Sequence, residues 1–195
     1  MPFGCNYWPV KTGPTFGNDE SHPVGANLFA LIHQWPVNIG PRGGSGMSYD
    51  NLRKGRVSIP HQVYFLTTVT AGRVPYFTDL FIGRLVVHEM RILHDSNAVN
   101  SFAWVLMPDH LHWLIELGEE YDLGNVVKRL KGRSSKSINQ VLGRNGAIWQ
   151  REYYEHALRY DEGIQETARY IVANPLRAKL VERLGDYPLW DAIWL

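Results

Sequence analysis

Two histidines lie two residues apart in the segment MPDHLHWLIEL, which covers residues 107–117. Successive side chains of a β-strand alternate between its faces, so His110 and His112 would share one face, with Cα atoms roughly 7 Å apart. From there two imidazoles can converge on one metal ion, at about 2.1 Å per nitrogen. Such pairs also recur by accident as half-buried polar residues, so a metal site requires a further ligand from another part of the chain.

A second group of polar residues recurs every four positions in the segment DEGIQETARYIVANP, residues 161–175. This spacing places them in one stripe of a helix, which consists of Glu162, Glu166, Tyr170 and Asn174. The apolar side of the same helix carries Ile164, Ala168, Ile171 and Val172. Histidine nitrogens with the amide oxygen of Asn174 suit Mg²⁺ or Mn²⁺ when water or phosphate completes the coordination shell, and Glu166 is an alternative oxygen ligand. A helical tyrosine more often packs with its hydroxyl at the rim of the core, and that interpretation of Tyr170 stays open at this point.

Strands and helices must hold these residues in place, and the pattern from residue 61 onward predicts the order β-α-β-β-α-β-α. The predicted strands cover 61–70, 100–107, 110–117 and 153–160, and the predicted helices cover 78–95, 122–143 and 161–175. We expect Thr78 or Asp79 to cap the first helix, Asp161 to cap the last one, and Gly132 to interrupt the middle one. The apolar side predicted for the first helix consists of Phe81, Ile82, Leu85, Val86, Met90 and Leu93.

The first six elements match the split βαβ motif of ferredoxin-like folds. We therefore predict an α+β fold, βαββαβ, with an antiparallel sheet, both helices on one face, and a C-terminal helix that carries Tyr170. The first and third strands would lie in the middle of the sheet. On the third strand, Leu111, Trp113, Ile115 and Leu117 would pack beneath the helices, while His110, His112, Leu114 and Glu116 would line the other face.

Composition bounds the class of protein. The chain has 195 residues, 45% of them hydrophobic, and a net charge of +1, which fits one domain with an extension and names no partner. The single cysteine, Cys5, excludes an internal disulfide and a zinc site built on thiolates. The sequence has no apolar run of 18 or more residues and no signal-peptide pattern, so we expect a cytoplasmic protein that does not span a membrane.

Residues 1–46 differ from the rest of the chain, because they are rich in Gly, Pro and Asn and end in the segment GPRGGSG. We expect residues 47–195 to form the domain, with Met47 as the natural start. The extension is then flexible or lies outside the native protein. The alternative is an N-terminal arm packed through Trp8, Phe29 and Trp35.

Basic residues gather between positions 123 and 144, where the chain has no acidic residue. They are Lys128, Arg129, Lys131, Arg133, Lys136 and Arg144. A local block of one sign suits phosphate contacts. For a single block, the alternative is an ordinary solvated helix face.

Four segments in this order together resemble the REP-associated tyrosine transposases, which are single-tyrosine transposases of the HUH endonuclease superfamily. The segments are MPDHLHWLIEL, LKGRSSKSIN, IWQREYYEHALR and ARYIVANPLRAKLV. The resemblance extends from about residue 50 to the C-terminus and leaves residues 1–46 outside the family's usual extent. It implies that His110, His112 and Asn174 bind a divalent metal, Mg²⁺ or Mn²⁺, and that Tyr170 is the catalytic nucleophile.

The resemblance also implies the activity. Family members cut and rejoin single-stranded DNA at repetitive extragenic palindromes, which are hairpins in bacterial chromosomes, through a 5′-phosphotyrosine. We expect a monomer, with a dimer as the alternative. Candidate DNA contacts are Arg53, Lys54, Arg56, Lys128, Arg129, Lys131, Arg133, Arg159, Arg169 and Arg177. Candidate stacking residues are Tyr153, Tyr154, Trp190 and Trp194, and His156 is a candidate for proton transfer, although core packing competes with each of these roles. A non-catalytic nucleic-acid binder on the same fold and a metal-dependent phosphohydrolase are the alternative functions.

Overall fold

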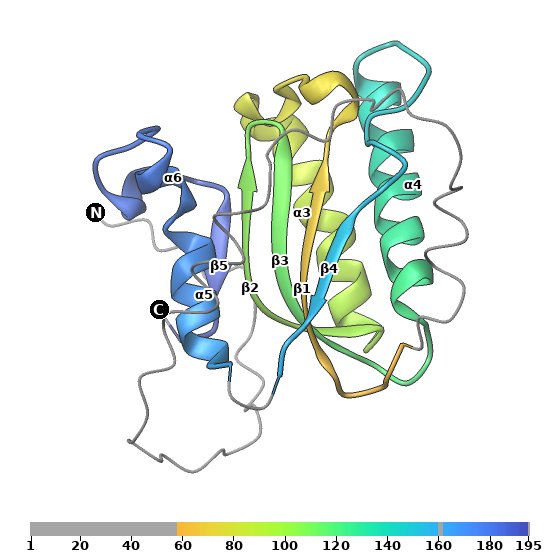
Figure 1. Ribbon diagram of the computed structural model, residues 1–195. Coiled ribbons are helices and arrows are strands. Elements are labelled where there is room, and N and C mark those ends of the chain that lie inside the picture. Colours follow the sequence, from red (N-terminus) through yellow and green to blue (C-terminus); the bar gives the residue numbers. More distant parts are fainter. Residues whose placement is uncertain (1–57, 160–161, 195) are drawn as a thin grey trace, which may run out of the picture.

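The computed structural model describes residues 58–159 and 162–194. These residues form a five-stranded antiparallel sheet in the order β4-β1-β3-β2-β5 (Figure 1). The strands are β1 (Val63–Val69), β2 (Val99–Met107), β3 (His110–Leu117), β4 (Tyr154–Ala157) and β5 (Trp190–Ala192). The helices are α3 (Leu80–Asp95), α4 (Leu123–Val141), α5 (Ile164–Val172) and α6 (Asn174–Arg177), with 3₁₀ turns η1 (Ala71–Arg73), η2 (Tyr76–Thr78) and η3 (Leu184–Asp186). The predicted α+β fold with β1 and β3 inside the sheet is confirmed.

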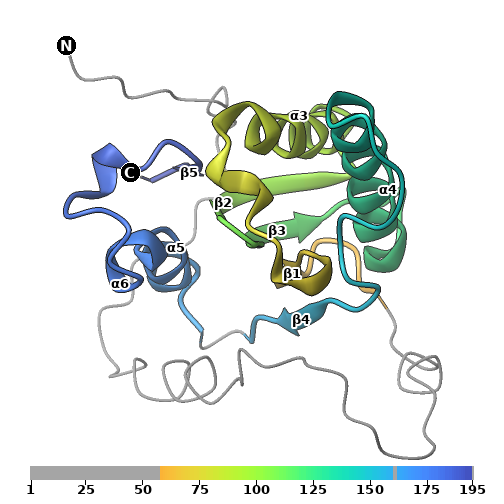
Figure 2. The same cartoon turned by 90° about the horizontal axis from the view of Figure 1, so that it is seen from above.

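Two apolar clusters lie on opposite faces of this sheet. Figure 2 shows α3 and α4 together on one side, with α5 and α6 well apart from them. The larger cluster joins α3 and α4 to Leu111, Trp113, Ile115 and Leu117 of β3, as the alternation predicted. The smaller cluster joins Ala168, Ile171 and Val172 of α5 to Leu114 and neighbouring strand residues. The histidine face of β3 is therefore the face on which α5 packs.

The strand β3 is firmly placed because it is paired on both sides. His112 lies opposite Thr67 of β1 and Val105 of β2. Beneath it, the Trp113 indole N–H donates a 2.8 Å hydrogen bond to the buried Ser101 hydroxyl. A central strand with satisfied polar groups gives its side chains little freedom to move, which suits a ligand-holding position.

Helix α3 begins as expected, but its buried face differs from the predicted one, since Val87 and His94 are also buried. The Asp79 side chain caps it by accepting from the backbone N–H groups of Phe81 and Ile82. Phe81 itself is 59% exposed, so its assignment to the apolar side was wrong. The buried stripe follows Ile82, with Val86, Met90 and Leu93, and Phe81 lies about 100° away from that stripe around the helix axis.

The other helices also differ from prediction. Helix α4 runs without a break through Gly132, since its buried apolar side outweighs one weak helix former. Helix α5 begins after Gly163, which makes no side-chain cap, and the predicted cap Asp161 lies outside the described residues. The last helix was predicted to end at Pro175, but α5 ends at Val172. Pro175 instead occupies the first turn of α6.

Strand β5 was not predicted. It pairs with β2 and extends the sheet beyond the four strands expected, and its three residues are too few for a clear alternation signal. The expectations for residues 1–46 and Met47 lie outside the described residues, as do Arg53, Lys54 and Arg56.

Candidate functional site

His110 is held by a chain of polar contacts at the start of β3. Its Nδ1 lies 2.6 Å from Asp109 Oδ1, and Asp109 Oδ2 accepts a 2.8 Å hydrogen bond from Arg73. These two hydrogen bonds lower the pKa of Asp109, that with His110 contributing more. An ionised carboxylate only accepts, so Nδ1 carries the proton and donates. The lone pair of His110 is then on Nε2, which is the arrangement that carboxylate partners impose on metal-binding histidines.

His112 has a similar arrangement on the same face. Its Nδ1 shares a 2.8 Å hydrogen bond with the Thr67 hydroxyl, and its ring centre lies 4.8 Å from that of His110 at 81° between the planes. Burial lowers the pKa of His112 well below its ordinary value, and the nearby charges of His110 and Arg177 lower it further. A neutral imidazole with Nδ1 engaged can offer Nε2 to a metal.

Tyr170 lies on α5 beneath the guanidinium of Arg177. The guanidinium carbon is 3.8 Å from the centre of the phenol ring, and Arg177 also donates a 2.8 Å hydrogen bond to the Tyr170 carbonyl. The charge of Arg177 also contributes to the lowered pKa of His112, and burial lowers the pKa of Arg177 itself. Sequence reasoning assigned Arg177 to DNA phosphates, whereas here it stacks on the predicted nucleophile.

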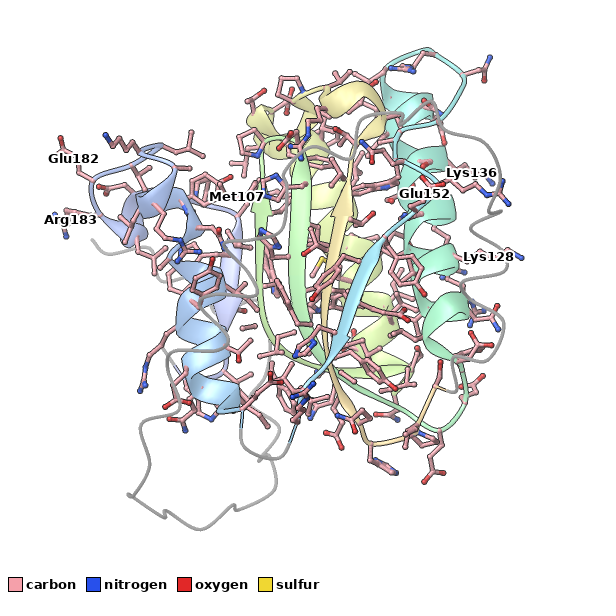
Figure 3. All side chains as sticks on the ribbon, viewed as in Figure 1. Met107, Lys128, Lys136, Glu152, Glu182 and Arg183 are labelled. Carbon is pink, nitrogen blue, oxygen red and sulfur yellow. The ribbon has the colours of Figure 1, made fainter. Side chains whose placement is uncertain are left out.

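Asn174 lies where α5 passes into α6. Its amide nitrogen donates a 2.7 Å hydrogen bond to the Ile171 carbonyl, which orients the amide and leaves Oδ1 outside that bond. Helix α5 packs on β2, β3 and β5, on the sheet face that carries the histidines, and Asn174 follows this helix after Ala173. Met107, the partner of His110 across the β2–β3 pair, is labelled beside this helical segment in Figure 3. The donor set, two imidazole nitrogens and an amide oxygen, fits a divalent cation whose shell water or phosphate completes.

The remaining polar residues of the predicted stripe have other partners. The Glu162 carboxylate accepts from His156 Nε2 at 2.8 Å and from the Arg159 backbone N–H at 2.8 Å. Glu166 is 68% exposed and lies 3.9 Å from Arg169. Glu166 also precedes Asn174 by about 12 Å of helix. The structure therefore brings neither carboxylate to the Asn174 end of the helix.

The predicted DNA contacts on α4 divide into engaged and outward-facing side chains. The Lys131 ammonium donates to the carbonyls of Gln150 and Glu152 at 2.9 and 2.8 Å, which makes it a structural group. Arg129 covers the Tyr121 ring at 4.3 Å, and Arg133 lies 3.9 Å from Glu89. Lys128 and Lys136 point outward from the helix (Figure 3). Arg159 and Arg169, outside α4, are exposed.

The candidate stacking residues contact the protein itself. Tyr154 meets Phe65 edge-on at 6.2 Å, and burial raises the pKa of its phenol, with the charge of Glu162 adding to the effect. Trp194 packs on Phe102 at 5.6 Å, although it is partly exposed. Trp190 belongs to β5, and Tyr153 faces Lys131.

Sequence reasoning missed Asp109, Arg73 and Thr67, the residues that orient the two histidines. Asp109 directly precedes His110, and its Pro-Asp pair was interpreted only as a turn signal. The available signal for Asp109 was its position directly before a candidate metal ligand. Arg73 and Thr67 lie far from β3 in sequence and carried no such signal.

Comparisons with known proteins find similar chains. The family model described as Transposase IS200 like matches residues 59–174. A predicted REP-associated tyrosine transposase of Haemophilus influenzae is 28% identical over 141 residues, covering 65% of this chain and 77% of that protein. A REP-associated tyrosine transposase of Escherichia coli is 30% identical over 88 residues, covering 44% of this chain and 50% of that protein.

The fold is also found among solved structures. A REP-associated tyrosine transposase bound to a REP hairpin superimposes with a TM-score of 0.57 at 23% identity, covering 75% of this chain and 82% of that chain. Within the part of the chain that the structure describes, no helix is both long and apolar enough to cross a membrane.

Proposed function

Because the chain belongs to the family described as Transposase IS200 like, we propose that it cleaves and rejoins single-stranded DNA at palindromic hairpins through a 5′-phosphotyrosine. The observation that carries the proposal is the shared sheet face. His110 and His112 lie there with both Nδ1 atoms engaged, and α5, which carries Tyr170 and is followed by Asn174, packs on the same face. A phosphodiester bound on this face would meet a nucleophile and a set of metal ligands together.

The metal ligands in this proposal are His110, His112 and Asn174. A bound Mg²⁺ or Mn²⁺ would supply Lewis-acid stabilisation of the phosphate oxygens. Asp109 and Thr67 hold the two imidazoles in orientation from behind, and Trp113 fixes the strand beneath them. The protein's share is thus to hold the nitrogen ligands in a fixed geometry.

Tyr170 performs the covalent step. Its phenol oxygen attacks the phosphorus of the scissile phosphodiester, the bond from phosphorus to the 3′-oxygen breaks, and the departing oxygen takes up a proton as a 3′-hydroxyl. The phenol loses its own proton in the attack. The new phosphotyrosine bond conserves the phosphodiester energy, so attack by a second 3′-hydroxyl restores the phenol and rejoins the DNA.

Arg177 assists this tyrosine. A phenol with its ordinary pKa near 10 is a weak nucleophile at neutral pH and requires a nearby cation or base. The guanidinium stacked 3.8 Å above the Tyr170 ring is such a cation, since its charge favours the phenolate that develops during attack. The same side chain fixes the ring by bonding the Tyr170 carbonyl.

The substrate follows from the same proposal. The partner would be single-stranded or hairpin DNA of the REP type in the bacterial cytoplasm, where the chromosome lies, and the working unit would be a monomer. The solved structure of similar fold is described as bound to a REP hairpin. A sizing measurement in solution distinguishes this monomer from the alternative dimer.

The test is incubation of a labelled single-stranded hairpin with the protein and Mg²⁺ or Mn²⁺. A covalent adduct that survives SDS is expected with the wild-type chain and with Tyr154→Phe, a control on the same face. Tyr170→Phe should form none, because it lacks the phenol oxygen that attacks in this proposal. An adduct that persists in Tyr170→Phe would refute the role of Tyr170. Binding with no cleavage under either metal would instead favour the non-catalytic binder.

A further inference from the structure

A groove lies between α4 and the segment 147–153 that leads into β4. It encloses about 450 Å³, within the range of sites that hold nucleotide-sized ligands. Its walls include Asn125, Lys128, Lys131, Gly132, Arg151 and Tyr153. Helix α4 lies across the sheet from α5, so the groove is separate from the face that carries Tyr170 and the histidines (Figure 2).

The charge of the groove favours an anion. Lys128, Lys131 and Arg151 line it, and among the residues that the structure describes the only acidic one in its walls is Asp122. Both Asp122 carboxylate oxygens are engaged at the start of α4, accepting from the Asn125 backbone N–H at 2.6 Å and from its side-chain amide at 2.9 Å. Lys128 lines the groove and is exposed, and its side chain points outward from α4 (Figure 3).

The wall opposite α4 is held in place by a side chain of α4 itself, Lys131. The Lys131 ammonium donates to the carbonyls of Gln150, Arg151 and Glu152 and lies 5.5 Å from the centre of the Tyr153 ring. These contacts tie the segment 150–153 to the helix across the floor of the groove. They place a half-buried aromatic ring next to basic side chains, the combination that binds unpaired bases together with their phosphates.

Gly132 in the groove wall has no explanation within the described protein. It lies in the middle of the 19-residue helix α4, where glycine weakens a helix relative to alanine. A Cβ added at this position would meet no atom within 4 Å, so packing does not demand a glycine. Glycine does leave the helix backbone bare, which permits a ligand to approach closely.

We propose that this groove binds an unpaired segment of DNA, with a phosphate at Lys128 and a base against Tyr153. The inference rests on the proposed function and adds a second DNA site on the opposite side of the sheet from the cleavage chemistry. An unpaired segment is specified because a base inside a duplex cannot offer its face to Tyr153. The site would hold one part of the substrate while another part reaches Tyr170.

Fluorescence anisotropy with a labelled oligothymidylate in EDTA, where no cleavage occurs, tests the charge. Loss of one phosphate contact in Lys128→Ala should weaken binding about fivefold at 0.1 M salt and reduce the salt slope by about 0.7. Lys136→Ala is the matched control, since Lys136 is exposed on the same helix but does not line the groove. Equal losses in the two variants would overturn the proposal, because the attraction would then belong to the whole helix.

Gly132→Ala tests whether the ligand approaches the backbone of α4 closely. The alanine should raise the melting temperature by about 2–4 °C through better helix propensity. It should nevertheless weaken oligothymidylate binding at least threefold, because its methyl group occupies ligand space. A variant that is more stable and binds as tightly as wild type would refute close approach at Gly132. Tighter binding of duplex DNA or of oligouridylate than of oligothymidylate would overturn the choice of single-stranded DNA.

The two proposals fail in different ways. If the groove is wrong and the function is right, wild type forms the covalent adduct and both groove variants bind oligothymidylate normally. If the function is wrong and the groove is right, no adduct forms with either metal, yet Lys128→Ala and Gly132→Ala still bind more weakly than wild type.

Discussion

Among single side chains, the two histidines of β3 show how packing sets chemical state. Asp109 and Thr67 each engage one Nδ1, and the low pKa of Asp109 keeps its carboxylate ionised, so that His110 must donate to it. Burial of His112 disfavours the imidazolium and so lowers the pKa of its side chain. A neutral imidazole at His112 results where a metal would require one.

The depressed pKa of His112 predicts a pH-dependent stability. Below its ordinary value near 6.5, the unfolded chain binds a proton that the folded chain does not, so acidification favours unfolding. The contribution of His112 is complete above that value and is lost as the pH falls toward the folded value, by up to about 1.4 kcal/mol per pH unit.

Urea unfolding of the protein in EDTA between pH 5 and pH 8 measures this effect, with pH values chosen around the ordinary histidine pKa. His112→Gln should flatten the acid side of the profile, while His88→Gln, at an exposed histidine of α3, should leave it unchanged. An unchanged slope in His112→Gln would show that His112 is not the group responsible.

Among helices and strands, Lys131 connects α4 to the segment that leads into β4. Lys131 was predicted to bind DNA, but its ammonium satisfies carbonyls of the segment that leads into β4. Strand β4 is a short edge strand paired only with β1 among the described strands. Its position therefore depends on contacts outside the sheet.

Lys131→Met should destabilise this edge. Methionine retains much of the aliphatic stem but removes the donor, so carbonyls of residues 150–152 lose charged hydrogen bonds, at a cost of about 1–3 kcal/mol. Urea unfolding should report the loss, and hydrogen exchange should quicken at the amides of β4. Lys128→Met, at an exposed position of the same helix, should change neither the urea unfolding nor the exchange at β4. Equal effects of the two substitutions would show that Lys131 has no special structural role.

For the molecule as a whole, the candidate metal ligands come from β3 and from the α5–α6 junction, which lie on separate layers. A ligand that binds the folded chain but not the unfolded chain stabilises the whole fold against unfolding. At ten times the dissociation constant, Mn²⁺ should stabilise the fold by about 1.4 kcal/mol. That corresponds to a rise of roughly 3–6 °C in melting temperature.

Thermal melting with Mn²⁺ and with EDTA measures this shift without any DNA. His110→Ala should lose the shift, and Asn174→Ala should reduce it. His156→Ala should retain it, because that histidine is bonded to Glu162 rather than to the candidate site. A full shift in His110→Ala would place the bound ion elsewhere.

Much of this arrangement was predictable from local periodicity. Strand alternation placed His110 and His112 on one face and Trp113 on the other, and helical spacing put Tyr170 and Asn174 one turn apart. These relations involve residues close in sequence, so backbone geometry alone fixes them. The order of the elements then indicated the ferredoxin-like sheet.

Contacts between residues distant in sequence were not predictable in this way. These contacts depend on how helices and strands pack against one another. They include the partners of the histidines, the stacking of Arg177 on Tyr170, the carbonyl contacts of Lys131 and the pairing of β5 with β2. Period and propensity describe one element at a time. Which side chain satisfies which buried polar group is decided when the sheet and its helices pack, because that is when water is excluded and each such group must find a partner.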